Sequence, residues 1–214
     1  SAVAAALNGS IDVTQVFSSV GAFAALRADG SVVTWGDSFS GGDSSAVAAA
    51  LDGSLDVTEV FSTAQAFAAL RADGSVVTWG HSGLGGDSSA VAAALDGSID
   101  VTQVFSTERA FAALRADGSV VTWGHSPWGG NSSAVAAALD GSIDVTQVFS
   151  TERAFAALRA DGSMVTWGDS SRGGDSSAVA AALDGSLDVI QVFSTRGAFA
   201  ALRADGSLVT WGYS

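Results

Sequence analysis

Hydrophobic and polar positions follow a pattern that recurs every 44 residues, and the second copy illustrates it. Residues 55–61 alternate in polarity and are rich in β-branched side chains, which is typical of a strand with one buried face. Two further apolar runs, 66–71 and 75–79, are separated by Ala72-Asp73-Gly74. Asp-Gly between apolar runs is a strong hairpin signal. Each copy therefore predicts a three-stranded antiparallel meander.

The hairpin signal also predicts a register. A two-residue turn at Asp73-Gly74 would pair Leu70 with Val77 and Ala68 with Trp79. A large ring opposite a methyl group packs without a clash, and every copy has the same pair of residue types.

A short helix is predicted at residues 46–51, where serine precedes an alanine-rich stretch and glycine follows it. Val47 and Leu51 lie four residues apart and give this helix one apolar face. Because six residues hold a helix only with tertiary support, a fourth strand is the alternative for this segment.

The five copies form one predicted repeat domain, 1–214, with repeats at 1–44, 45–88, 89–132, 133–176 and 177–214. A period of this length is typical of a solenoid or a propeller. The terminal copies lack the polar capping face that an open solenoid needs, so a closed ring is favoured. We expect Ser1–Leu7 to complete the last repeat against residues 191–212 as a clasp. A monomeric five-unit ring is favoured, and half of a larger ring made by two chains is the alternative.

The segments DGSVVTWG, DV-x-x-VF and AFAAL, which recur along the whole chain, resemble the repeats of the regulator of chromosome condensation (RCC1) superfamily. This resemblance implies an all-β fold, a β-propeller with five RCC1-like blades. The unit is shorter than the family's usual repeat, and its loop reads GGDSS or GGNSS instead of Gly-Gln-Leu-Gly. Some members exchange guanine nucleotides or bind chromatin, but no residue set in this chain matches such a site, so only the fold is carried over.

Charge and composition narrow the range of possible binding partners. The net charge is −13, and all nine basic residues are arginines, so binding of nucleic acid is not expected. The chain has no cysteine, which excludes disulfides and thiolate metal sites. No stretch reaches the ~18 apolar residues of a membrane span, so no membrane partner is expected. The start at serine, with no signal peptide, suggests a processed or excised segment.

Differences between the copies gather in two zones, the dipeptide before AFAAL and the loop after Trp-Gly. In a meander, both zones lie at the same end of the strands, and the invariant turns lie at the other end. We interpret the variable end as a recognition surface for a protein or carbohydrate ligand, with loop residues such as Phe39, Leu84 and Trp128 exposed. The alternative is a structural or engineered scaffold that has no specific ligand. The candidate residues are Phe39, Gln65, His81, Leu84, Glu108, Arg109, His125, Trp128, Glu152, Arg153, Asp169, Arg172, Arg196 and Tyr213.

Sites of other chemistry are not expected. His81 and His125 occupy equivalent loops without metal-ligand spacing, so we expect no metal and no cofactor. The DGSID segments lack the glycine and the distal glutamate of a calcium loop. No serine lies in a nucleophile elbow, and a carboxylate pair would be duplicated in every copy, so we expect no enzyme. The recurring strand arginine, such as Arg71, is expected to pair with the strand aspartate, such as Asp56.

Overall fold

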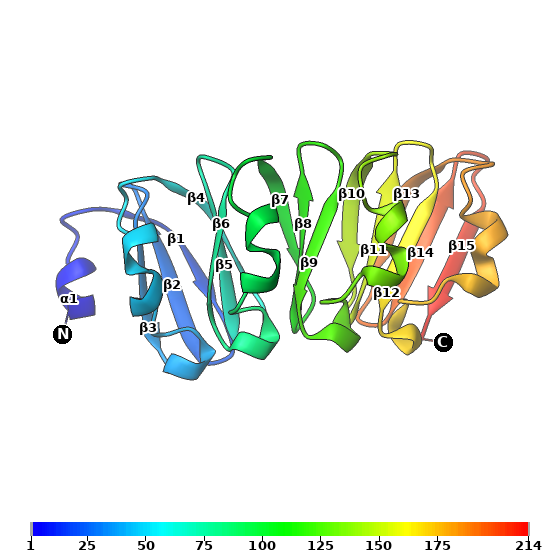
Figure 1. Cartoon of the computed structure of the whole chain (residues 1–214). Helices are drawn as coiled ribbons and strands as arrows, with labels where there is room; N and C mark the ends of the chain where they lie inside the picture. Colours follow the sequence, from blue (N-terminus) through cyan, green and yellow to red (C-terminus); the bar gives the residue numbers. More distant parts are fainter. Residues whose placement is uncertain (1, 214) are drawn as a thin grey trace. The chain divides into compact units, whose positions relative to one another are not determined.

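The computed structural model describes residues 2–213, and the chain forms two compact units, Ser1–Val104 and Phe105–Ser214. Five antiparallel three-stranded sheets follow one another along the sequence, as the meander predicts (Figure 1). Sheet 1 contains β1 (Val13–Ser18), β2 (Ala22–Arg27) and β3 (Val32–Gly36), and sheet 2 contains β4 (Val57–Ser62), β5 (Ala66–Arg71) and β6 (Val76–Gly80). Sheet 3 contains β7 (Val101–Ser106), β8 (Ala110–Arg115) and β9 (Val120–Gly124), and sheet 4 contains β10 (Val145–Ser150), β11 (Ala154–Arg159) and β12 (Met164–Gly168). Sheet 5 contains β13 (Val189–Ser194), β14 (Ala198–Arg203) and β15 (Leu208–Gly212).

The alanine-rich segments are helical, so the helix and not the fourth strand is confirmed. They form α1 (Ala2–Ala6) and the 3-10 helices η2 (Ser45–Ala50), η4 (Ser89–Ala94), η6 (Ser133–Ala138) and η8 (Ser177–Ala182). The predicted serine cap is wrong at η2, where the Ser44 side chain makes no capping bond. Instead, Asp43 Oδ1 accepts the Ser45 N–H at 2.9 Å.

The predicted hairpin register is wrong by one position on the third strand. Leu70 pairs with Val76, and Phe67, not Ala68, lies opposite Trp79. A two-residue turn needs positive φ at both central residues, but in the described residues only glycines have positive φ. The turn therefore has three residues and ends in a left-handed glycine, Gly74. The result is an aromatic pair in which the Phe67 and Trp79 rings stack at 5.3 Å.

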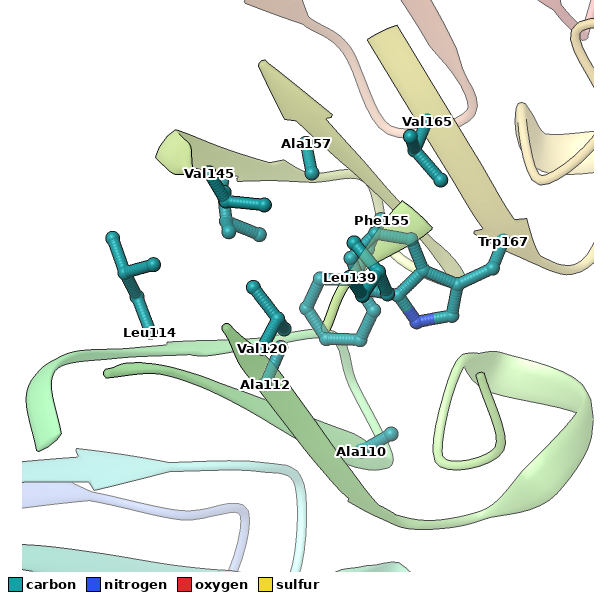
Figure 2. Packing of buried hydrophobic residues seen from close by; sticks show 11 residues of the cluster. Ala110, Ala112, Leu114, Val120, Leu139, Val145, Phe155, Ala157, Val165 and Trp167 are labelled. Carbon is teal, nitrogen blue, oxygen red and sulfur yellow. The ribbon is translucent and has the colours of Figure 1, made fainter. Parts of the chain in front are cut away.

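The hydrophobic core lies between neighbouring sheets, and we call each such interface a junction. At the junction of sheets 3 and 4, β8 and β9 contribute alanines, Leu114 and Val120 (Figure 2). Sheet 4 contributes Val145, Val148, Phe155, Ala157, Val165 and Trp167, and the segment between the sheets adds Leu139. An alanine-rich face thus receives the large rings of the next sheet. The same residue types form the junction of sheets 1 and 2.

The invariant turns meet at one end of the sheets, which we call the turn end (residues 28–31 and 52–54 and their equivalents). Val57 donates a backbone hydrogen bond to Gly30 O at 2.9 Å, so the turn of sheet 1 is tied to sheet 2. A Cβ on Gly30 would lie 2.6 Å from Asp56 Cα, so glycine is required there. This close contact explains why the glycine of this turn does not vary.

The predicted pairing of the strand arginine with the strand aspartate is wrong. Arg27 Nη2 lies 2.7 Å from Asp29 Oδ2, in its own hairpin, and Arg159 makes the equivalent pair with Asp161 at 3.9 Å. The three-residue turn brings its aspartate back beside the guanidinium. Hydrogen bonds from Arg27 and Ser31 hold the pKa of the Asp29 carboxyl well below its usual range.

The N-terminal helix α1 packs against β3, and Arg27 Nη1 donates a hydrogen bond to Ala6 O at 3.4 Å. Helix η2 packs in the same way on β6, the third strand of its own repeat. The clasp between residues 1–7 and the last repeat would join the two units, and it stays a prediction. Ser1 lies outside the described residues.

Candidate recognition surface

The two variable zones lie together within each sheet, as the meander predicts. We call this region the loop end (residues 19–21 and 37–41 and their equivalents). Backbone hydrogen bonds hold the zones in contact: Asp37 N donates to Gly21 O at 2.8 Å, and His125 N donates to Arg109 O at 2.9 Å. A Cβ on Gly21 would lie 2.9 Å from Ser40 Oγ. The two zones of a repeat therefore form one local surface.

Main-chain hydrogen bonds also connect the loop ends of neighbouring sheets. Glu108 N donates to Glu152 O at 2.9 Å, and Glu152 N donates to Arg196 O at 3.0 Å. In unit 1, Val20 N donates to Ala64 O at 2.9 Å. These hydrogen bonds join main-chain groups, so they are retained when the side chains at these positions change.

Side chains of the loop after Trp-Gly alternate in direction. Each loop forms one turn of 3-10 helix, η1 (Ser38–Ser40), η3 (Ser82–Leu84), η5 (Ser126–Trp128) or η7 (Ser170–Arg172). The third position faces solvent, and Phe39 there is 58% exposed. The fourth position turns inward, so Leu84 is 8% exposed and Trp128 is 7% exposed. The predicted exposure is therefore right for Phe39 and wrong for Leu84 and Trp128.

Trp128 is buried because two arginines cover its ring. The Arg109 guanidinium carbon lies 4.1 Å from the ring centroid, and that of Arg153, from the next sheet, lies 4.3 Å away. His125 adds an edge contact at 5.9 Å. Stacked guanidinium groups make favourable cation–π contacts with indole. This ring links sheets 3 and 4 and offers no open aromatic platform.

Charged side chains form a network beside Trp128. Arg196, which is largely exposed, donates from Nε and Nη2 to the Glu152 carboxylate. Arg153 lies 3.8 Å from Glu152 and 4.0 Å from Asp169. The hydrogen bond from Arg196 lowers the pKa of Glu152 to about 2. Burial, followed by the hydrogen bond with Glu152, raises the pKa of Glu108.

The remaining candidates form smaller contacts. Phe39 meets the edge of His81 at 4.3 Å, and Arg172 lies 5.0 Å above the exposed Tyr213 ring. The carbonyl of the partly exposed Gln65 accepts the His81 N–H at 2.8 Å. Sequence reasoning left Val20 out of the candidates, although its side chain is among the most exposed apolar ones. The signal was available, because the other copies place Ala, Glu or Arg at this position.

Two further searches of the described residues were negative. No group of three or more His, Cys, Asp or Glu side chains is placed to hold a metal ion. No helix in this part of the chain is long and apolar enough to cross a membrane.

We expect Arg196→Gln to lower the free energy of unfolding only slightly at pH 7, because the ion pair with Glu152 is solvent-exposed on the arginine side. The pKa of Glu152 is lowered on folding, so its contribution is present above the ordinary value of 4.5 and is lost as pH falls through about 2. Urea titrations at pH 7 and near pH 2 should show a larger difference at pH 7. Arg172→Gln is the control, and an equal loss at both pH values would contradict the assignment.

Comparisons with known proteins identify the fold. No protein-family model matches the chain, and no curated protein sequence matches it. Among solved structures, the ectodomain of the Physcomitrella patens receptor kinase CR4 is similar at a TM-score of 0.59 and 15% identity, over 95% of this chain and 53% of that one. Human WBSCR16 is similar at 0.58 and 19% identity, over 94% of this chain and 62% of that one.

Yeast RCC1 (Prp20), solved bound to Kap60, is similar at a TM-score of 0.55 and 15% identity, over 92% of this chain and 55% of that one. The prediction is thereby confirmed for the fold alone: the five three-stranded sheets have an RCC1-like fold of β-propeller type. The chain spans between half and two thirds of the length of these three structures.

Proposed function

We propose that this chain is a protein-binding module whose partner docks on the loop end of unit 1, centred on Phe39. The observation that carries this proposal is an aromatic ring, 58% exposed, on a rigid turn. Asp37 caps that turn by accepting hydrogen bonds from Ser40 N and Oγ, and Gly41 closes it in the left-handed conformation. Exposed aromatic side chains on rigid scaffolds are typical centres of protein interfaces.

Neighbouring residues extend this surface. Val20 is exposed on the same loop end of sheet 1, and His81 contacts the edge of the Phe39 ring. The net charge of −13 favours a partner of positive charge, which it would attract over long range. A protein ligand is preferred to a carbohydrate because Trp128, the largest aromatic ring of the loops, is buried and covered by two arginines.

Proteins with similar structures agree with this choice. Yeast RCC1 is described in complex with Kap60, and Prp20p of Saccharomyces cerevisiae is described with binding properties to Gsp1p and histones. Since fold alone does not define function, these partners support the class of ligand and not its identity.

The test is to probe arrays of purified proteins and of glycans with the labelled chain. We expect signals on the protein array that fall at least tenfold in Phe39→Ser, because hot-spot aromatics carry much of the binding energy. The matched control is Ile190→Thr, which removes another exposed apolar side chain and restores the threonine of the other copies. Binding to glycans alone, or equal binding by both variants, would contradict the proposal. Absence of any signal would favour the scaffold without a ligand.

A further inference from the structure

Sheet 1 has an apolar face on which its own unit leaves Val13, Val16 and Phe23 exposed. We call it the head face, and it consists of Val13, Val16, Phe23, Ala25, Val33 and Trp35. Val16 is 57% exposed, and Phe23 is also exposed. The equivalent residues of sheet 4, Val148 and Phe155, are buried because sheet 3 packs on them.

Sheet 5 leaves exposed the face that an internal sheet packs against the sheet that follows it. Its tail face consists of Ala198, Ala200, Leu202 and Leu208, and Leu208 is 59% exposed. At the same repeat position, Val120 and Met164 are buried against the sheet that follows them. The two end sheets thus expose the surfaces that the internal sheets bury.

The two faces together contain the residues of an existing junction. In Figure 2, the face of sheet 3 that carries Ala110, Ala112 and Val120 packs against the face of sheet 4 that carries Val145 and Phe155. The head face has the same residue as sheet 4 at all six positions, and Leu7 matches Leu139. The tail face differs from that of sheet 3 only in having leucine in place of Val120. Met164 fills this position at the junction of sheets 4 and 5, so the added volume fits.

Polar groups at the faces match as well. At internal junctions, Met164 N donates to Leu183 O at 2.9 Å, and Val189 N donates to Gly162 O at 3.1 Å. The counterparts are Leu208 N with Leu7 O, and Val13 N with Gly206 O. A Cβ on Gly206 would meet no atom within 4 Å, whereas one on Gly162 would meet Asp188. The turn at Gly206 therefore has room for a strand aspartate such as Asp12.

We propose that a second copy of this chain docks on these faces, with the head face of one copy against the tail face of the other. The interface is head-to-tail, because the two faces differ and neither is complementary to itself. The matched receptor-kinase ectodomain and WBSCR16 use more chain than one copy supplies, since this chain spans 53% and 62% of them. A second copy of this chain would supply the additional length. This inference is independent of the proposed function.

One hydrogen bond of the internal junctions has no counterpart among the described residues of the head face. At internal junctions, tryptophan Nε1 donates to a loop glycine, as Trp167 does to Gly129 O at 3.1 Å. In the part of the chain that the structure describes, Trp35 Nε1 on the head face makes no such bond. The interface therefore depends on its apolar residues, which are the ones to substitute.

The first test measures the mass of the chain in solution by light scattering over a dilution series. We expect at least twice the 21.2 kDa of one copy, falling to one copy on dilution. The variants Val16→Glu and Leu208→Glu should each raise the apparent Kd at least ~100-fold, because the new carboxylate would be buried without a partner. Both side chains are exposed in one copy, so folding should survive, and circular dichroism checks it. Ile190→Glu, at an exposed residue outside both faces, is the control.

The second test mixes the two variants. Val16→Glu keeps its tail face and Leu208→Glu keeps its head face, so the mixture should form a one-to-one complex although neither variant associates alone. A single-copy mass for the wild type at every concentration would overturn the proposal and favour closure of one chain on itself. Dissociation by Ile190→Glu, or no complex on mixing, would overturn it too. Phe39→Ser should leave the mass unchanged, which separates this inference from the proposed function.

Discussion

Phe155→Ala should lower the free energy of unfolding by about 3–5 kcal/mol, the cost of removing a fully buried aromatic side chain. The ring stacks on Trp167 at 5.2 Å and fills the junction with sheet 3, so its loss leaves a cavity between two sheets. Because a domain of this size is stable by about 5–15 kcal/mol, the effect is a large fraction of the total. Chemical denaturation followed by tryptophan fluorescence measures it.

The control for this prediction is Phe23→Ala, the same position in sheet 1. Phe23 has the same neighbours in sequence and a stacked tryptophan, Trp35, at 5.3 Å, but its side chain is exposed. We expect a loss of about 1 kcal/mol or less. Both variants should be compared in the Leu208→Glu background, so that association does not cover Phe23. Equal losses for the two would contradict the assignment of the core to the junctions.

The second large effect is expected for Gly162→Ala, at the turn end of sheet 4. Gly162 has φ +75°, and a Cβ there would lie 2.8 Å from Asp188 Cα. The substitution combines the strain of a left-handed residue, about 1–2 kcal/mol, with a clash that costs about 1–3 kcal/mol more. The midpoint of urea unfolding should fall accordingly.

Gly206→Ala provides the matched control, since Gly206 holds the same place in sheet 5 with φ +83° and no atom within 4 Å of a Cβ. It should show the strain of the backbone alone, about 1–2 kcal/mol. If the two alanine variants lost equal stability, the contact between the turn and the neighbouring sheet would make no contribution to folding.

Most of the fold could be predicted from the repeat. Five copies of one pattern predicted the three strands and the helix, because periodicity and turn residues are local signals. The hairpin register could not be predicted in this way, because Asp-Gly fits both a two-residue turn and the end of a three-residue turn. The three-residue turn places Phe67 against Trp79, a cross-strand stack that the turn residues alone do not indicate. The ion pair of Arg27 with Asp29 depends on the three-residue turn, so the expected two-residue turn did not predict it.

The sequence predicted where the candidate surface lies, but not which of its side chains face solvent. Differences between copies identified the loop end, and the meander placed the two variable zones together. Sequence variation does not tell an outward side chain from an inward one. Phe39 holds the third position of its loop and Trp128 the fourth position of the equivalent loop in the third repeat, and the one-turn helix sends these positions in opposite directions. Burial of Trp128 also requires Arg153 from another repeat, which no local pattern indicates.

The main-chain hydrogen bonds through Glu108, Glu152 and Arg196 have a practical consequence. Since main-chain groups connect these positions whatever their side chains are, codons there and at the third loop position can be randomised while these backbone hydrogen bonds are retained. Such a library would display a different chemical surface in every clone, and selection from it would yield new binders without a redesign of the fold.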